Sequence, residues 1–153
     1  MDINGVPAVV TGGASGLGEA TARYLASKGA KVALFDVQID KAEAVAKEIG
    51  GIAIHCDVTN SESAEQAIAA AREAHGACGI AVNCAGIGSP GRILGRKGPM
   101  SLDFFSKVIQ VNLIGSFNIL RLAAADMQTR EANADGERGV IISTASVAAF
   151  EGQ

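Results

Sequence analysis

Residues 11–18 read TGGASGLG, and this stretch decides the fold of the 153-residue chain. An apolar run precedes it, and a segment with helical periodicity follows it. Gly12 lets the chain turn sharply off a strand, Gly16 lets the backbone approach a ligand without a Cβ in the way, and Gly18 lets the helix pack closely on the sheet. The alternative is an ordinary glycine-rich corner. Strand, glycines and helix occur in the order that predicts a dinucleotide-binding turn.

The residues around this turn predict which dinucleotide binds. The helix start offers free N–H groups and the positive end of its dipole to a pyrophosphate, with Ser15 and the Leu17 backbone as expected donors. The next predicted strand ends at Asp36, whose carboxylate can accept both ribose hydroxyls and would repel a 2′-phosphate. No Arg or Lys stands at Ala14, Ser15 or Val37 to attract that phosphate. We therefore expect NAD rather than NADP, the alternative being a solvated Asp at a strand end.

Strands and helices alternate along the rest of the chain. Strands are expected over residues 7–11, 31–36, 52–56, 79–83 and 140–143, and helices over residues 16–28, 40–49, 61–74 and 101–127. Residues 87–100 are rich in Gly and Pro and are expected to form a loop, and residues 129–139 a surface excursion. This alternation predicts an α/β fold with a doubly wound parallel sheet of the Rossmann type, in a single NAD-binding domain over residues 1–153.

Two further strand ends carry candidate cofactor residues. The corner after the third strand lies beside the adenine in such folds, although an Asp there can also cap the next segment. Small residues after the fourth strand leave room for a ribose and nicotinamide, and an Asn there can tie neighbouring strands together. The residues concerned are Asp57, Val58, Asn83, Cys84, Ala85 and Gly86.

Composition excludes several classes of partner. Hydrophobic residues make up 48% and charged residues 19%, and the net charge is −3, without the basic stripe of a nucleic-acid-binding protein. The cysteines Cys56, Cys78 and Cys84 show no metal-binding spacing, and His55 beside Cys56 is expected to be an ordinary strand end, so we expect no metal. No apolar run reaches membrane-spanning length, and the N-terminus lacks a signal peptide. We expect a cytoplasmic protein without a membrane partner.

The motifs together resemble the short-chain dehydrogenase/reductase family in its non-extended form. They are TGGASGLG, Asp36, Asp57-Val58, the NCAG run at Asn83, Asn112 in a long helix, and Ser146 after the fifth strand. The segments VNCAG, VNLIGSFN and IISTASVAAFEGQ are similar to the type II 3-hydroxyacyl-CoA dehydrogenase group, also called 17β-hydroxysteroid dehydrogenase type 10. The resemblance implies NAD-dependent oxidation of a secondary alcohol to a ketone, with 3-hydroxyacyl-CoA as substrate and a homotetramer as the full-length assembly.

The resemblance also implies roles for two residues. Ser146 matches the serine that hydrogen-bonds the substrate oxygen, although Ser143 and Thr144 are nearby hydroxyls. Asn112 matches the asparagine that holds a water in the proton relay, the alternative being a buried polar residue in a helix bend. In the loop over residues 87–100, Arg92, Arg96 and Lys97 can meet the phosphates of a CoA thioester, or they can simply be solvated.

One departure from the family pattern limits the expected activity. The family's acid–base pair is a Tyr and a Lys four residues later, about a dozen residues past the serine, and this chain ends before that point. Its only tyrosine, Tyr24, forms a YxxxK match with Lys28 inside the first predicted helix, which we interpret as coincidence. We expect the family's last strands and helices to be missing, the fifth strand to have an open edge, and this chain alone to be inactive.

Three hypotheses about function follow. The first is a dehydrogenase whose C-terminal part is missing from this chain, and the second is a non-catalytic NAD-binding module. The third is a sugar-nucleotide epimerase of the extended type, against which the spacing of Gly12, Gly16 and Gly18 argues. The first two are separated by whether the native reading frame continues past Gln153 into a YxxxK segment.

Overall fold

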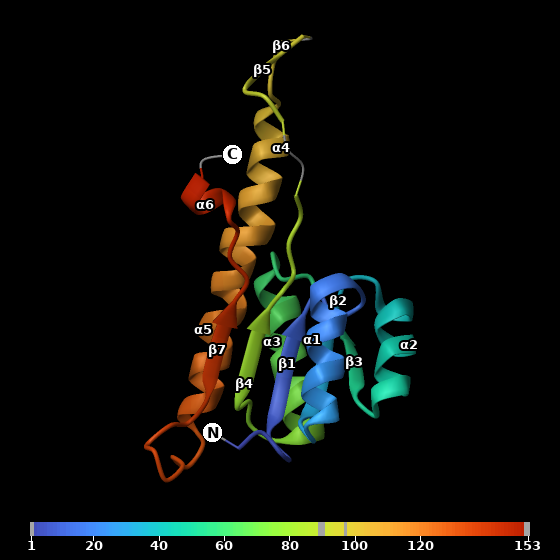
Figure 1. The fold of residues 1–153 in the computed structure, drawn as a ribbon, viewed down its shortest axis with the longest axis vertical. Helices are drawn as coiled ribbons and strands as arrows, with labels where there is room; N and C mark the ends of the chain where they lie inside the picture. The colour runs from blue at the N-terminus through green and yellow to red at the C-terminus, as the bar shows by residue number, and fades with distance from the viewer. Residues whose placement is uncertain (1, 89–90, 97, 152–153) are drawn as a thin grey trace.

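A five-stranded parallel sheet forms the centre of the computed structural model, which describes residues 2–88, 91–96 and 98–151 (Figure 1). Its strands are β1 (Pro7–Thr11), β2 (Lys31–Asp36), β3 (Ile52–His55), β4 (Ile80–Asn83) and β7 (Val140–Ser143). The order across the sheet is β3-β2-β1-β4-β7. The chain therefore moves outward in one direction from β1 to β3 and in the other from β4 to β7. The switch point lies between β1 and β4, and ligands of doubly wound sheets bind at the carboxyl ends of the strands there.

Helices cover both faces of the sheet. They are α1 (Gly16–Ser27), α2 (Ile39–Ile49), α3 (Ser61–His75), α4 (Leu102–Ile109) and α5 (Ser116–Gln128), with a short α6 (Ala148–Glu151) near the end. Side chains alternate along each strand, so Val10 and Leu34 pack in the layer of α1 and α2, whereas Val9 and Phe35 pack in the layer of α3 and α5. The predicted Rossmann-type α/β fold with an aliphatic core is confirmed.

The predicted element bounds are close to those observed. β1, β2 and β7 match, β3 ends one residue before the predicted Cys56, and β4 begins one residue after Gly79. The expected loop at residues 87–100 contains an unpredicted hairpin of β5 (Leu94–Gly95) and β6 (Gly98–Pro99), which projects away from the sheet (Figure 1). Strands of two residues are too short to show alternation in a sequence.

The predicted helix at residues 101–127 is one continuous column with a π-helical segment, η1 (Gln110–Gly115), between α4 and α5. Over Leu102–Gln128 it is long and apolar enough to cross a membrane, with a mean hydropathy of 1.4 and 22% of that window buried. The expectation that no run reaches this length was therefore wrong. Length and composition alone are weak evidence for a membrane span, since mostly buried core helices pass the same test; here α5 packs against β4, β7 and α3.

The fifth strand of the sheet, β7, pairs within the described residues with β4 alone. Its residues are mostly exposed, and Ile142 is half exposed. The predicted open edge at this strand is therefore present.

Candidate functional site

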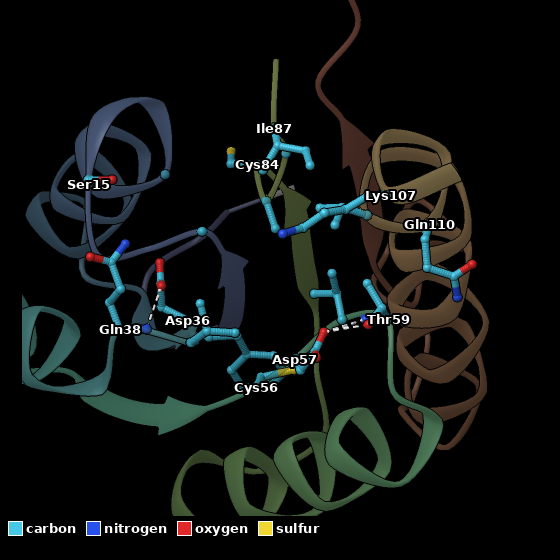
Figure 2. A pocket seen from close by; sticks show the side chains of 18 of the residues that line it. Ser15, Asp36, Gln38, Cys56, Asp57, Thr59, Cys84, Ile87, Lys107 and Gln110 are labelled. Atoms are coloured by element: carbon cyan, nitrogen blue, oxygen red, sulfur yellow. Dashed lines mark hydrogen bonds between the residues drawn. The ribbon is translucent and has the colours of Figure 1, made fainter. Parts of the chain in front are cut away.

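A pocket of about 910 Å³ opens at the carboxyl ends of the strands beside the switch point (Figure 2). The turn after β1, the ends of β2, β3 and β4, and the helix α4 surround it. Eleven of the twelve predicted cofactor residues line it: Gly12, Ser15, Gly16, Leu17, Gly18, Asp36, Asp57, Val58, Cys84, Ala85 and Gly86. The twelfth, Asn83, is buried below it.

The glycine turn has the shape of a phosphate cradle. Gly12 and Gly16 have φ values of +66° and +56°, which side chains rarely adopt. A Cβ on Gly18 would lie 2.1 Å from the carbonyl oxygen of Gly12, so only glycine lets α1 approach the turn this closely. A Cβ on Gly16 would meet no atom within 4 Å. The Ser15 side chain makes no capping hydrogen bond. The uncapped start of α1 thus adjoins the pocket, and these residues fit a pyrophosphate.

The carboxylate of Asp36 is fixed at the end of β2. Its Oδ2 accepts a hydrogen bond from the backbone N–H of Ala14 at 3.0 Å, and its Oδ1 accepts one from the N–H of Gln38 at 2.9 Å. Asp36 is buried, yet it lines the pocket. Each carboxylate oxygen keeps a second lone pair that can accept a hydroxyl of a ligand.

The corner after β3 is held by local hydrogen bonds. Asp57 Oδ1 accepts from the backbone N–H of Thr59 at 2.9 Å and from its hydroxyl at 2.7 Å. The cap of α3 is Asn60, which accepts from the N–H of Ser63, so Asp57 is not the cap. Burial, and secondarily the charge of Asp57, raises the pKa of the Cys56 thiol to about 12. The Cys56 thiol, which lines the pocket beside this corner, is therefore neutral at physiological pH.

The strand end at residues 83–86 is tied to its neighbours. The hydroxyl oxygen of Thr11 accepts from the N–H groups of Cys84 and Ala85 at 3.1 and 3.0 Å, which joins the ends of β1 and β4. Asn83 Nδ2 donates to the carbonyl of Ser116 at 3.4 Å and to the hydroxyl of Ser143 at 3.5 Å. Asn83 therefore links β4 to α5 and β7, a role that needs no contact with the pocket.

The two predicted catalytic residues do not line the pocket. Asn112 lies in η1, and its amide makes two hydrogen bonds of 2.9 Å with the backbone of Ile87. It is exposed, so the alternative of a buried polar residue does not hold, although it does lie in an irregular helix. Ser146 precedes α6, where its Oγ accepts from the N–H of Ala148 at 3.2 Å. The structure therefore places both residues outside the pocket that the predicted cofactor-binding residues line.

The wall contributed by α4 and η1 was missed in the sequence. It consists of Asp103, Ser106, Lys107, Gln110 and Val111. Their spacing places them on one helical face, and this polar stripe in an otherwise apolar helix was the available signal. Lys107 extends from α4 into the pocket (Figure 2). It is the only Lys or Arg among the described lining residues.

Two other predicted features lie away from the pocket. Tyr24 on α1 is 62% exposed, and the Lys28 Nζ lies 5.4 Å from its ring centre. Neither residue lines the pocket. Arg92 and Arg96 are exposed around the β5–β6 hairpin, and Lys97 lies outside the described residues. No group of three potential metal ligands occurs in the described part of the chain.

A family model described as short chain dehydrogenase matches residues 7–153. The chain belongs to the short-chain dehydrogenase family. It is 45% identical over 155 residues to the 3-hydroxyacyl-CoA dehydrogenase type-2 of Homo sapiens, covering 99% of this chain and 59% of that relative. It is 37% identical over 147 residues to a mitochondrial borneol dehydrogenase of Lavandula x intermedia, covering 95% of this chain and 53% of that protein.

Solved structures show the same likeness for this short-chain dehydrogenase. The crystal structure of 3-hydroxyacyl-CoA dehydrogenase type-2 from Mycobacterium avium matches with a TM-score of 0.90 and 40% identity, covering 97% of this chain and 59% of that one. The predicted resemblance to the family, and to its 3-hydroxyacyl-CoA dehydrogenases, is therefore confirmed. The chain spans about three fifths of the length of these relatives.

Proposed function

We propose that this short-chain dehydrogenase binds NAD in the pocket and serves the interconversion of a secondary alcohol and a ketone. The observation that carries the proposal is the fixed Asp36 carboxylate at one side of a glycine-built phosphate cradle. Asp36 accepts the adenosine ribose hydroxyls, the start of α1 binds the pyrophosphate, and the corner at Asp57 receives the adenine. When bound, NAD supplies the hydride acceptor at its nicotinamide ring.

Preference for NAD over NADP rests on charge. The backbone N–H groups of Ala14 and Gln38 hold Asp36 where a 2′-phosphate of the adenosine ribose would lie. The one described cation of the pocket wall, Lys107, comes from α4 on the other side of the pocket (Figure 2). Two unit negative charges, such as a carboxylate and a phosphate, repel each other by about 4 kcal/mol when they lie 4 Å apart near a protein surface. Asp36 therefore disfavours NADP.

The proposed substrate is a 3-hydroxyacyl-CoA. Support comes from relatives named 3-hydroxyacyl-CoA dehydrogenase type-2 at 45% identity. In this proposal Ser146 donates a hydrogen bond to the substrate oxygen. Among the described residues its Oγ accepts from the N–H of Ala148 and donates to no acceptor, so its own proton is available for donation. We also propose that the full-length protein is a homotetramer.

A non-catalytic NAD-binding role for residues 1–153 alone is the second candidate, and the place of the tyrosine favours it. The only tyrosine is on α1, exposed and away from the pocket, so it cannot take a proton from a substrate held by Ser146. Losing a general base lowers a rate by about 10²–10⁴-fold. We therefore propose that the 153-residue chain alone does not turn over and binds NAD only weakly.

The test compares this chain with the longest product of its native reading frame, following NADH formation from a 3-hydroxyacyl-CoA. We expect turnover only from a product that carries a Tyr–Lys pair past Gln153, and loss of turnover when that product carries Ser146→Ala. If the 153-residue chain turns over at a rate comparable to that of the longer product, and Ser146→Ala abolishes this rate, a residue within the 153 residues supplies the base. Tyr24→Phe is the matched control and should leave any rate unchanged.

A further inference from the structure

Asn118 on α5 hydrogen-bonds to the backbone of the corner after β3, at Val58 and Asn60. It is buried, with 7% of its surface exposed. Its Nδ2 donates to the carbonyl oxygen of Val58 at 2.9 Å and to that of Asn60 at 3.4 Å. These are the carbonyls on either side of Thr59, so one side chain from a distant helix fixes the backbone that presents Asp57 and Val58 to the pocket.

Arg121 fixes the orientation of that amide. Its Nε and one terminal nitrogen donate to Asn118 Oδ1 at 3.0 and 2.8 Å. Because the amide oxygen faces the guanidinium, the amide NH₂ must face the two carbonyls. The same terminal nitrogen reaches Ser61 Oγ at 2.8 Å and Glu65 Oε1 at 3.1 Å, at the start of α3. Hydrogen bonds from Ser61 and Arg121 lower the pKa of Glu65, so the ion pair persists at neutral pH.

The π-helical segment supports the same corner at a second point. Gly115 ends η1, and a Cβ there would lie 2.5 Å from Val58 Cγ2. Val58 is therefore pressed directly against the column formed by η1 and α5. The helices η1 and α5 therefore fix both the backbone around Thr59, through Asn118, and the Val58 side chain, through Gly115. Neither Asn118 nor Gly115 lines the pocket.

We propose that Asn118, oriented by Arg121, is a positioning residue that sets how tightly and how selectively the Asp57–Val58 corner binds adenine. This inference rests on the proposed NAD site. It gives α5 a part in recognition of the nucleotide base without contact with the ligand. Without the clamp, the Val58 carbonyl loses the Asn118 donor, whereas the Asn60 carbonyl keeps the N–H of Ala64 at 3.1 Å. The backbone at Val58 is then no longer held to α5, and the corner no longer keeps the Asp57 carboxylate at the exocyclic amine.

The test uses nicotinamide hypoxanthine dinucleotide, which has a carbonyl oxygen where the adenine of NAD has its amine. We expect the wild-type protein, as the longest product of its reading frame, to bind NAD more tightly than this analogue by about fivefold or more, the worth of one hydrogen bond. Asn118→Leu should bring the ratio of the two dissociation constants close to one. Arg121→Met, a milder change at a half-exposed site, should lower the ratio by about twofold or more.

Arg72→Met is the matched control. Arg72 also joins α3 to α5, through Asp126 and Thr129, but it does so at the other end of the helix pair. Its side chain is 48% exposed and that of Arg121 is 39% exposed, but its partner Asp126 is only 6% exposed, against 54% for Glu65. Arg72→Met should therefore cost at least as much stability as Arg121→Met, which makes it a strict control for general destabilisation. Arg72→Met should lower the melting temperature and leave the ratio unchanged.

The outcomes separate the two proposals. A wild-type ratio near one would overturn the adenine site of the proposed function. A clear wild-type ratio that survives in both Asn118→Leu and Arg121→Met would overturn the positioning role alone. If Arg72→Met lowers the ratio as much as Arg121→Met, the effect is one of general stability and the positioning role is also wrong. Should Asn118→Leu fail to fold, Arg121→Met and its control decide the question.

Discussion

Gly16 and Gly18 stand two residues apart in the same turn, and alanine at each should have opposite consequences. A Cβ at Gly18 would lie 2.1 Å from the Gly12 carbonyl oxygen and 2.6 Å from its carbonyl carbon. Both atoms belong to the backbone, so they cannot move aside as a flexible side chain would. Overpacking typically costs about 1–3 kcal/mol, and a contact this short belongs at the upper end or beyond. Gly18→Ala should therefore destabilise the fold strongly.

Gly16→Ala meets no atom within 4 Å, so the only cost to the fold is the φ value of +56°. An alanine in this left-handed region costs about 1–2 kcal/mol. Each kcal/mol lowers the melting temperature of a domain of this size by about 2–4 °C, so we expect a loss of about 2–8 °C for Gly16→Ala and a larger loss for Gly18→Ala. The added methyl group at position 16 occupies space beside the cradle and should weaken NAD binding.

Thermal unfolding and cofactor titration of both variants measure these effects. We expect Gly16→Ala to keep most of the stability and lose affinity by about tenfold or more, equivalent to about 1.4 kcal/mol. A Gly16→Ala protein that binds NAD as tightly as the wild type would refute the place of the pyrophosphate. A Gly18→Ala protein as stable as the wild type would refute the close contact between α1 and the turn.

Two further predictions concern reactivity and substrate contacts. Alkylation by iodoacetamide at about pH 8 should label Cys84, which is half-buried in the pocket wall, and spare the buried Cys56, whose pKa is raised to about 12. Bound NAD should protect Cys84 from labelling. Labelling of Cys56 before Cys84 would contradict the order of burial. Replacing Arg92, Arg96 and Lys97 together by Gln should raise KM for an acyl-CoA and spare a small uncharged alcohol, whereas equal effects on both substrates, or none, would count against a CoA contact.

Much of the fold followed from local patterns. β1 and β2 are short apolar runs that end at glycines or an acid, and such runs identify buried parallel strands even without a partner in view. The π-helical turn at Gln110–Gly115 could not be predicted, because a change from i+4 to i+5 hydrogen bonding leaves almost no trace in hydrophobic periodicity.

The site divided in the same way. Asp36 and Asp57 were predictable because each stands at the carboxyl end of a strand, and these ends of parallel strands meet at one edge of a sheet. Lys107 was missed although it belongs to a polar stripe, because the stripe alone does not show that this face of α4 turns toward the pocket. The Asn118–Arg121 pair was equally hidden, since its partners lie about sixty residues earlier in the chain.

The most direct test of the proposed cofactor site is a titration of NAD and of NADP against the same protein, in the longest form that its native reading frame encodes. The fixed carboxylate of Asp36 should make NAD bind more tightly by at least about tenfold. Asp36→Ala should weaken NAD binding and narrow the difference between the two cofactors. Tighter binding of NADP than of NAD by the unmutated protein would contradict the site as described.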